Sequence, residues 1–272
     1  MKVIPRDEHC ISRKNISDSA LKVMSRLRKH DHQAYLVGGA VRDLLLGGHP
    51  KDFDIATDAT PEEVHALFRN SRIIGRRFRI VHVRFGREII EVTTFRGHHD
   101  SDGEAGKTAS HQSDKGLLLR DNVYGTLEED AVRRDLTVNA LYYDSSSFSV
   151  MDHVNGREDL ERRRICVIGD PATRYREDPV RMLRVLRFAA RLDFKIERKT
   201  AAAIPQCAGL LGEIPSARLF DEFLKLFMTG AAEATLERLL EHRLLEYLFP
   251  ETDHLLRQDQ RARELVRLAM AS

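Results

Sequence analysis

The sequence predicts a mixed α/β head followed by a part that consists almost only of helices. In the first half, short apolar runs that end at glycines or alternate with polar residues are separated by short helical patterns. From about residue 176 onward, apolar residues recur at helical spacing. The 272 residues also exceed the roughly 150 after which a single core tends to divide.

We expect four segments along this chain. A leader and helix cover residues 1–30, and the α/β head covers 31–155. A helical neck covers 156–230, and a helical body begins within 231–272.

The head begins with a helix and a buried strand. Residues 17–30 (SDSALKVMSRLRKH) place Leu21, Met24 and Leu27 at helical spacing. QAYLV, residues 33–37, is an apolar run that stops at a double glycine and therefore predicts a strand.

Further short elements follow in the head. The sequence Thr60-Pro61-Glu62-Glu63 has the pattern of an N-cap, a first-turn proline and a capping-box glutamate, so it begins a helix. The other expected elements are a short helix over 40–46, a strand over 52–57, and β-rich runs over 72–85 and 87–95. Residues 98–116 are polar, glycine-rich and aperiodic, which predicts a mobile loop or insertion.

The second half is expected to be helical. Continuous helical patterns cover residues 177–192, 216–228 and 233–249. No internal repeat is evident in the sequence.

Composition excludes several classes of protein. Hydrophobic residues make up 42% and charged residues 32%, as in an ordinary globular chain, and the formal net charge is only +2. The first residues lack the apolar stretch of a signal peptide, and no apolar run reaches the roughly 20 residues of a membrane helix, so we expect a cytoplasmic protein. Cys10, Cys166 and Cys207 are too few and too scattered for a disulfide framework or a thiolate zinc site.

Two aspartates in DFDIAT are candidates for metal binding. Side chains alternate along a strand, so Asp52 and Asp54 are expected on one face and Phe53 on the buried one. Two carboxylates this close repel unless a cation lies between them. Mg²⁺, with Mn²⁺ as a substitute, meets this need when carboxylates and substrate phosphates bind it together. An exposed acidic pair beside a turn is the alternative.

The double glycine upstream favours a phosphate site. Gly38 and Gly39 lie where a strand meets a helix, so the backbone can approach an anion toward which unpaired N–H groups point. Arg42, one turn into the helix, could reach the same phosphates. The sequence therefore predicts a triphosphate-binding site beside a metal-binding site.

These motifs together resemble the signature of the nucleotidyltransferase superfamily, in its branch of tRNA CCA-adding enzymes and bacterial poly(A) polymerases. The residues that carry the resemblance are GGAVRD, residues 38–43, and DFD, residues 52–54. The resemblance implies a nucleotidyltransferase head with a palm-like mixed sheet, an all-α neck and a helical body.

Later segments extend the resemblance. EEDAVRRDLTVNALYYD, residues 128–144, is similar to the family's second motif, which implies that Arg134 contacts the triphosphate, Asp135 completes the acidic centre and Asn139 positions the ribose. Glu91 is the competing third carboxylate. The implied reaction is attack by an RNA 3′-hydroxyl on the nucleotide α-phosphate with two metal ions.

DHVNGREDLERRRI, residues 152–165, resembles the connection to the neck, and REDPVRMLRVLRFAARL, residues 176–192, resembles the helix that reads the incoming base. Asp178 and Arg181 are three residues apart, so we expect them on one helical face, where they could pair with an exocyclic amine and a ring nitrogen. Adenine and cytosine offer this combination. Arg184 and Arg187 continue the stripe, and an amphipathic helix with solvated arginines is the alternative.

Two segments favour the poly(A) polymerases within this family. IIGRRFRIVHV, residues 73–83, with its basic pair Arg76-Arg77, and the leader over residues 4–27 resemble the corresponding parts of those enzymes. The partners implied are ATP and RNA 3′ ends. Because family members continue into a longer helical body and an RNA-binding tail, we expect this chain to be a fragment.

Three alternatives remain open at this point. One is CCA addition to tRNA from CTP and ATP. The second is nucleotide transfer to a protein or small molecule, and the third is a non-catalytic module that binds RNA or nucleotides. The sequence carries no pattern that indicates an oligomeric state.

Overall fold

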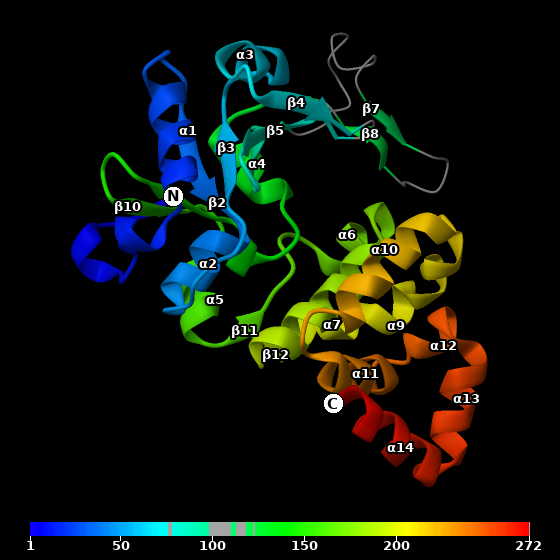
Figure 1. Ribbon diagram of the computed structural model, residues 1–272. Coiled ribbons are helices and arrows are strands. Elements are labelled where there is room, and N and C mark those ends of the chain that lie inside the picture. Colours follow the sequence, from blue (N-terminus) through cyan, green and yellow to red (C-terminus); the bar gives the residue numbers. More distant parts are fainter. Residues whose placement is uncertain (76–77, 98–109, 113–117, 122, 272) are drawn as a thin grey trace. The chain divides into compact units, whose positions relative to one another are not determined.

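The computed structural model describes residues 1–75, 78–97, 110–112, 118–121 and 123–271. It divides the chain into two compact units, with unit 1 covering Met1–Asp114 and Leu118–Leu160, and unit 2 covering Lys115–Leu117 and Glu161–Ser272. Unit 1 contains a mixed sheet, whereas the described part of unit 2 is mainly helical (Figure 1). The predicted fold class is confirmed.

An eight-stranded sheet organises unit 1. The strand order is β1-β10-β9-β2-β3-β6-β5-β4, with β3 and β6 parallel and the other neighbours antiparallel. Its strands are β1 (Lys2–Ile4), β2 (Ala34–Val37), β3 (Asp54–Thr57), β4 (Ser71–Ile74), β5 (Ile80–Phe85), β6 (Glu88–Thr94), β9 (Leu141–Asp144) and β10 (Ser149–Asp152). A separate pair consists of β7 (Ser110–Gln112) and β8 (Leu118–Asp121).

The helices of unit 1 begin where local sequence signals place them. Ser17 caps the backbone N–H groups of Ser19 and Ala20 at the start of α1 (Asp18–Arg28). Both hydrogen bonds of the predicted capping box are present at α3 (Pro61–Leu67), between Thr60 and Glu63. The other helices are α2 (Gly39–Leu45), α4 (Leu127–Arg133) and α5 (Gly156–Glu161).

The two faces of the sheet carry different helices. Val37, Ala56 and Tyr142 form a buried cluster with Ala131 of α4 on one face. Phe85 lies on the other face, because it is three residues from His82, which is registered with Glu91 and through it with Asp54. Since Phe85 lines a cleft with residues of α1, α1 lies on the face opposite to Asp54 and Glu91.

Unit 2 is built around α7 (Val180–Leu192), which packs against α10 (Ser216–Phe227) and α11 (Ala232–Glu241). Its other elements are β11 (Arg164–Ile165), α6 (Pro171–Glu177), β12 (Lys195–Ile196), α8 (Arg198–Ala202), α9 (Ile204–Cys207), α12 (Leu245–Leu248), α13 (Pro250–Gln258) and α14 (Gln260–Ala271). None of the helices in the described ranges is long and apolar enough to cross a membrane.

Four sequence predictions need correction. The helix predicted over 177–192 begins at Val180, because Pro179 disfavours helical geometry at Asp178, whose φ and ψ are −152° and 92°. The helix predicted over 233–249 is divided between α11 and α12 by a turn. The strand predicted over 52–57 begins at Asp54. Most of the predicted loop 98–116 lies outside the described residues, but residues 110–112 within it form β7.

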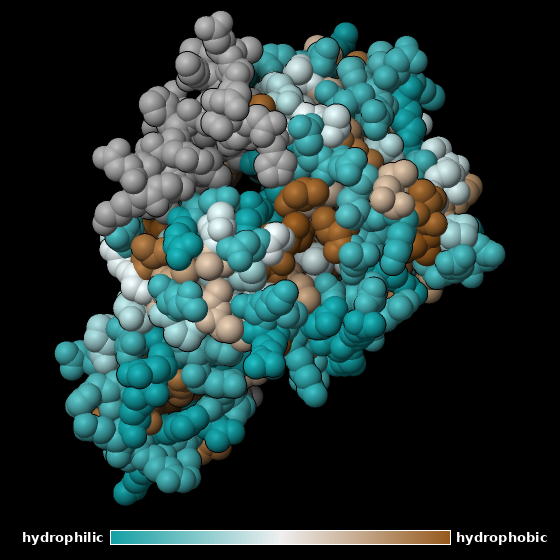
Figure 2. Space-filling view, turned by 180° about the vertical axis from the view of Figure 1, so that it is seen from behind, coloured by the Kyte–Doolittle hydropathy of each residue, from teal (hydrophilic) through white to brown (hydrophobic). Residues whose placement is uncertain are grey.

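Polar side chains dominate the face of the protein drawn in Figure 2, where brown hydrophobic residues form separate small patches. Among the described residues, Cys10, Cys166 and Cys207 take part in no disulfide, as predicted.

One buried ion pair joins α7 to α10 in unit 2. Arg187 Nε donates to Glu222 Oε1 at 3.0 Å, and the two residues are only 7% and 4% exposed. The guanidinium also lies 4.4 Å from the ring centroid of Phe188. Removing one partner of such a pair leaves a charge in a medium that solvates it poorly.

We therefore expect Arg187→Met to lower the free energy of unfolding of unit 2 by about 3–5 kcal/mol. Urea unfolding followed by circular dichroism at pH 7 measures this change. The double variant Arg187→Met/Glu222→Leu should recover most of the loss, since the buried Glu222 carboxylate is removed together with Arg187. Equal destabilisation by the single and double variants would contradict this account.

Candidate functional site

A row of registered side chains crosses one face of the sheet in unit 1. Paired residues of neighbouring strands share a face. The row contains, from β9 to β4, Tyr142, Val37, Asp54, Glu91, His82 and Arg72. Its centre is acidic, and Glu91 Oε1 lies at hydrogen-bond distance from His82 Nε2, at 3.1 Å.

Asp54 is the most perturbed carboxylate of this row. Burial, followed by the charge of Glu91 and opposed by Arg134, raises the pKa of Asp54 to about 6, with a smaller contribution from Asp52. Asp52 itself is exposed and precedes β3, so the two aspartates are not both strand residues as predicted. Phe53 between them is buried, as predicted.

Gly38 lies between an acidic and a basic group. It is the N-cap of α2 and has a φ of 75°, which favours glycine. A Cβ atom built at Gly38 would lie 3.7 Å from Arg134 Nη1 and 3.8 Å from Asp54 Oδ2. The structure therefore brings the double glycine, Asp54 and Arg134 together.

Arg134 is held by two partners on one side of its guanidinium. Its Nε donates to the Tyr142 hydroxyl at 2.8 Å, and its Nη2 donates to Asp130 Oδ2 at 3.1 Å. Although burial alone would lower it, these contacts raise the pKa of Arg134 above its ordinary value. The Nη1 atom is the one that lies beside Gly38.

Arg42 and Asn139, which the motifs assign to the nucleotide, contact each other. Arg42 is 2% exposed, and its Nη1 donates to Asn139 Oδ1 at 2.6 Å. Its Nε and Nη2 contact Asp43 Oδ1 at 2.8 and 2.7 Å. These contacts fix α2 against the turn that contains Asn139.

Asp135 directs one carboxylate oxygen toward the backbone. Its Oδ1 accepts a hydrogen bond from the N–H of Leu136 at 2.8 Å. The charges that perturb Asp54 are those of Glu91, Arg134 and Asp52. The acidic neighbour of Asp54 in the sheet is Glu91. The sequence offered Glu91 only as a competitor of Asp135.

The donor chemistry of Asp52, Asp54 and Glu91 fits a divalent cation. Carboxylate oxygens are the ligands that Mg²⁺ prefers, and a cation relieves the repulsion that raises the pKa of Asp54. Within the described ranges, no three side chains of His, Cys, Asp or Glu are already arranged to hold an ion. Because Mg²⁺ is commonly held by one or two carboxylates together with substrate phosphates, the residues fit an ion that binds with a nucleotide.

The shifted pKa of Asp54 predicts a pH-dependent stability. The folded state holds the proton up to about pH 6, whereas the ordinary pKa of an aspartate in an unfolded chain is 3.8. As pH rises from about 4 to about 6, the free energy of unfolding of the wild-type protein therefore falls by about 3 kcal/mol for a pKa shift of this size.

Asp54→Asn should consequently gain stability relative to wild type as pH rises through this window, and urea unfolding in EDTA at pH 4 and pH 7 measures the gain. A difference between the two proteins that stays constant with pH would contradict the assignment.

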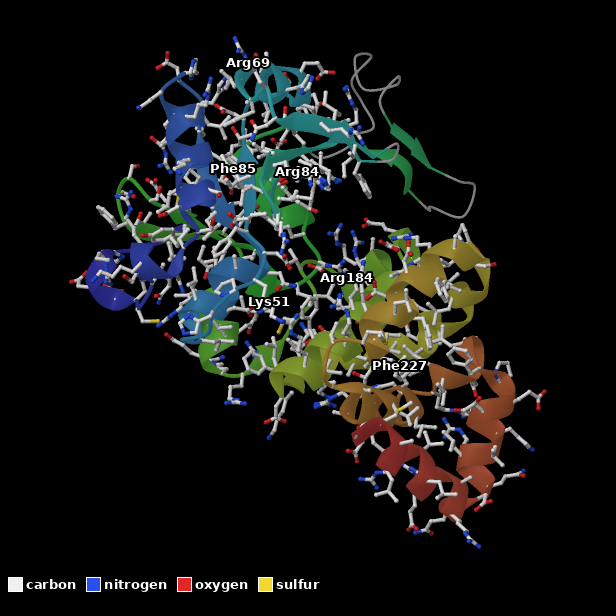
Figure 3. All side chains as sticks on the ribbon, viewed as in Figure 1. Lys51, Arg69, Arg84, Phe85, Arg184 and Phe227 are labelled. Atoms are coloured by element: carbon white, nitrogen blue, oxygen red, sulfur yellow. The ribbon has the colours of Figure 1, made fainter. Side chains whose placement is uncertain are left out.

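The predicted base-reading residues of unit 2 do not share one helical face. Asp178 ends α6, and its Oδ2 accepts from Arg218 Nη2 at 2.6 Å. Arg181 Nη1 donates to the Arg174 carbonyl and to Glu177 Oε2 at 2.8 and 2.9 Å. Arg184 lies on α7 (Figure 3), and Arg187 is buried against Glu222.

Asp178 nevertheless keeps an unused acceptor. Its Oδ1 is buried and has no hydrogen-bond partner among the described residues. A buried acceptor in this state costs free energy unless a ligand donates to it.

The sequence matches two families. The first, described as poly A polymerase head domain, covers residues 34–166. The second, described as probable RNA and SrmB-binding site of polymerase A, covers residues 193–256.

Two relatives and one solved structure show how far the similarity extends. Poly(A) polymerase I of Salmonella typhimurium is 57% identical over 250 residues, which are 92% of this chain and 54% of that protein. The CCA-adding enzyme of Bacillus pumilus is 39% identical over 229 residues, or 84% of this chain and 54% of the relative. The CCA-adding enzyme of Bacillus stearothermophilus in complex with CTP is 37% identical with a TM-score of 0.73, covering 88% of this chain and 55% of that one.

The chain spans about half the length of these relatives. Members of this nucleotidyltransferase family use divalent metal ions, and the carboxylate row of unit 1 has the matching donor chemistry. The head-domain match over 34–166 includes the motifs around Gly38, Asp54 and Arg134. The chain belongs to the family of tRNA CCA-adding enzymes and poly(A) polymerases.

Proposed function

We propose that this chain carries the nucleotidyl-transfer centre of a template-independent polymerase that adds AMP from ATP to RNA 3′ ends. The observation that carries the proposal is the 57% identity with poly(A) polymerase I over 92% of the chain, against 39% with a CCA-adding enzyme.

In the proposed reaction, the 3′-hydroxyl of RNA attacks the α-phosphate of ATP. A new phosphodiester bond forms, the bond to the β-phosphate breaks, and pyrophosphate leaves. Divalent ions held by the carboxylates would lower the pKa of the attacking hydroxyl and stabilise charge on the triphosphate.

Three carboxylates of unit 1 are assigned to these ions. Asp54 and Glu91 are direct neighbours in the sheet, and Asp52 adds a third negative charge close to Asp54. We place Glu91 in this centre because the parallel register of β3 and β6 puts it directly beside Asp54. Asp135 is assigned to positioning the turn after α4 through its hydrogen bond to Leu136.

The triphosphate is assigned to Gly38, Gly39 and Arg134. Arg134 Nη1 lies beside Gly38, and the other guanidinium nitrogens are held by Tyr142 and Asp130, so the orientation of the positive charge is fixed before a ligand binds. Arg42 supports this site by holding Asn139, which we assign to the ribose.

In unit 2, Asp178 and Arg181 are assigned to the pairing edge of the base, with Arg184 and Arg187 on the same helix as Arg181. The partnerless Oδ1 of Asp178 suits the exocyclic amine of adenine or cytosine. The buried contact with Glu222 gives Arg187 a supporting role, because it fixes α7 against α10.

CCA addition is the second candidate function. It is favoured by the 37% identity and TM-score of 0.73 with a CCA-adding enzyme whose structure contains CTP. Both reactions would use the same carboxylates, so the choice of nucleotide must distinguish them.

A primer-extension assay tests the proposal. The 272-residue chain is incubated with a 5′-labelled RNA ending in A, Mg²⁺, and ATP, CTP, GTP or UTP separately, and with CTP and ATP together. Long tails with ATP alone are expected. Addition limited to C, C and A on a tRNA lacking its 3′ end would assign the second function.

No extension with any nucleotide, in a protein that binds ATP, would instead indicate a non-catalytic nucleotide-binding module. Transfer of label from ATP to protein or to a small molecule would indicate a different acceptor. The Asp54→Asn variant is the control in every reaction.

A further inference from the structure

A cleft on unit 1 lies away from the carboxylate row. It has a volume of about 790 Å³ and is formed by α1, by residues that follow α3 and by the end of β5. Phe85 belongs to the opposite face of the sheet from Glu91 and Asp54. A ligand in this cleft therefore does not occupy the proposed nucleotide site.

The cleft is strongly basic. Lys22 and Arg26 of α1 and its C-cap Lys29 form one stripe at spacings of four and three residues, and Arg13 adds a fourth cation. Among the described residues that line the cleft, Asp18 is the one carboxylate. The protein as a whole has a net charge of only +2, so this concentration of cations is local.

The cations of the stripe differ from most arginines of unit 2 in that they form no ion pair with another described residue. In the described part of the chain, no ion pair or side-chain hydrogen bond links Lys22, Arg26 or Lys29 to another residue. In unit 2, by contrast, Arg187 and Arg263 contact carboxylates of neighbouring helices, and Arg257 contacts Asp253 of its own helix. The cleft thus keeps its positive charge available for a ligand.

Aromatic rings form part of the cleft wall. Arg26 lies over the Phe68 ring, with Cζ 5.4 Å from the centroid, and Phe85 is half-buried. Figure 3 shows Phe85 beside α1 and exposed Arg69 at the end of α3. Glu88, registered opposite Phe85, is the carboxylate that the sheet places beside this ring.

We propose that this cleft binds a single-stranded segment of RNA, separate from the 3′ end that would enter the carboxylate centre. The stripe on α1 would contact the phosphates, and Phe85 with the Arg26 guanidinium would stack against bases. Proteins that bind single strands without sequence preference combine these two features, a positively charged groove and aromatic rings. Base stacking favours RNA over an acidic polypeptide, which offers only charge.

The proposal rests on the proposed RNA-directed function, and it identifies where RNA other than the reacting end is held. Binding of a labelled oligo(A) to the 272-residue chain is measured by fluorescence anisotropy in EDTA without ATP. Because this assay needs neither metal ion nor catalysis, it separates failure of this proposal from failure of the tailing reaction.

The variant Lys22→Gln/Arg26→Gln/Lys29→Gln tests the phosphate contacts. Each phosphate contact of a single strand contributes about 0.7 to the slope of log K against log salt, so the triple variant should lose about 2 from this slope. At 0.15 M salt the affinity should fall on the order of 50-fold by the same relation. The matched control Lys2→Gln/Lys14→Gln/Arg261→Gln removes two lysines and one arginine that do not line the cleft.

Two further measurements identify the ligand class. Phe85→Leu should weaken oligo(A) binding by about tenfold while leaving binding of inorganic polyphosphate unchanged. Melting temperatures of all variants establish that they fold. An unchanged salt slope in the triple variant, or displacement of oligo(A) by polyglutamate as efficiently as by unlabelled RNA of equal charge, would overturn the proposal.

Discussion

Replacing Asp54 with asparagine is expected to reduce AMP transfer to RNA by about 10³-fold or more. The substitution keeps the shape of the side chain but removes the charge that would hold a divalent ion next to the triphosphate. Loss of several kcal/mol of transition-state stabilisation corresponds to a factor of this size, since each 1.4 kcal/mol is about tenfold in rate.

Single-turnover extension of a labelled RNA at saturating ATP measures the chemical step, and equilibrium binding of ATP in EDTA measures the ground state. We expect the rate to fall and the metal-free ATP affinity to rise, because the removed charge would repel the triphosphate when no ion is bound. Asp31→Asn is the matched control, since Asp31 is exposed, and asparagine tolerates its φ of 63°. An Asp54→Asn protein that extends RNA at the wild-type rate would remove the basis of the proposed function.

Local sequence signals were sufficient for much of the fold. The capping box at Thr60 and Glu63 predicted the start of α3, because its two hydrogen bonds are made within four residues. The glycine at position 38 likewise predicted a strand-to-helix turn, and its φ of 75° is one that glycine adopts readily. Where the cause of a structure lies within one turn, the sequence alone is informative.

Other features depended on competition between neighbouring signals. The apolar spacing of residues 177–192 predicted one helix, but Pro179 acts on the residue before it and separates α6 from α7. As a result, Asp178 is held by Arg218 and Arg181 by Glu177, and the pair does not form a single face. The apolar spacing correctly predicted which apolar side chains of α7 are buried. It could not predict where the helical backbone is interrupted.

The identity of the third carboxylate depends on long-range strand pairing. Glu91 and Asp54 are 37 positions apart in sequence, and the parallel register of β3 and β6 makes them neighbours. The sequence placed Glu91 on a β-rich run, but it did not indicate which strand would lie next to that run. By contrast, Asp135 belongs to the motif over residues 128–144 and was favoured by its position in that motif.

Glu91→Gln is therefore expected to lower the rate of AMP transfer by about 100-fold, and Asp135→Asn by less than about tenfold. Glutamine can keep a hydrogen bond to His82 Nε2, so the loss would report the charge of Glu91 and not the geometry of β6. Asparagine at position 135 can still accept from the Leu136 N–H, so the turn after α4 should be preserved. Single-turnover rates as a function of Mn²⁺ concentration measure both variants, and Glu91→Gln should need more metal to reach half its maximal rate.

A second observable distinguishes the two residues without catalysis. Burial, followed by the negative charge of Glu91, raises the pKa of Asp54 to about 6, so Glu91→Gln should lower that pKa, whereas Asp135→Asn should leave it nearly unchanged. Carboxyl chemical shifts followed by NMR in EDTA give the value in each variant. If Asp135→Asn both moved the pKa of Asp54 and lost more activity than Glu91→Gln, the metal centre would be built from the motif after α4, and the pairing of β3 with β6 would serve only the fold.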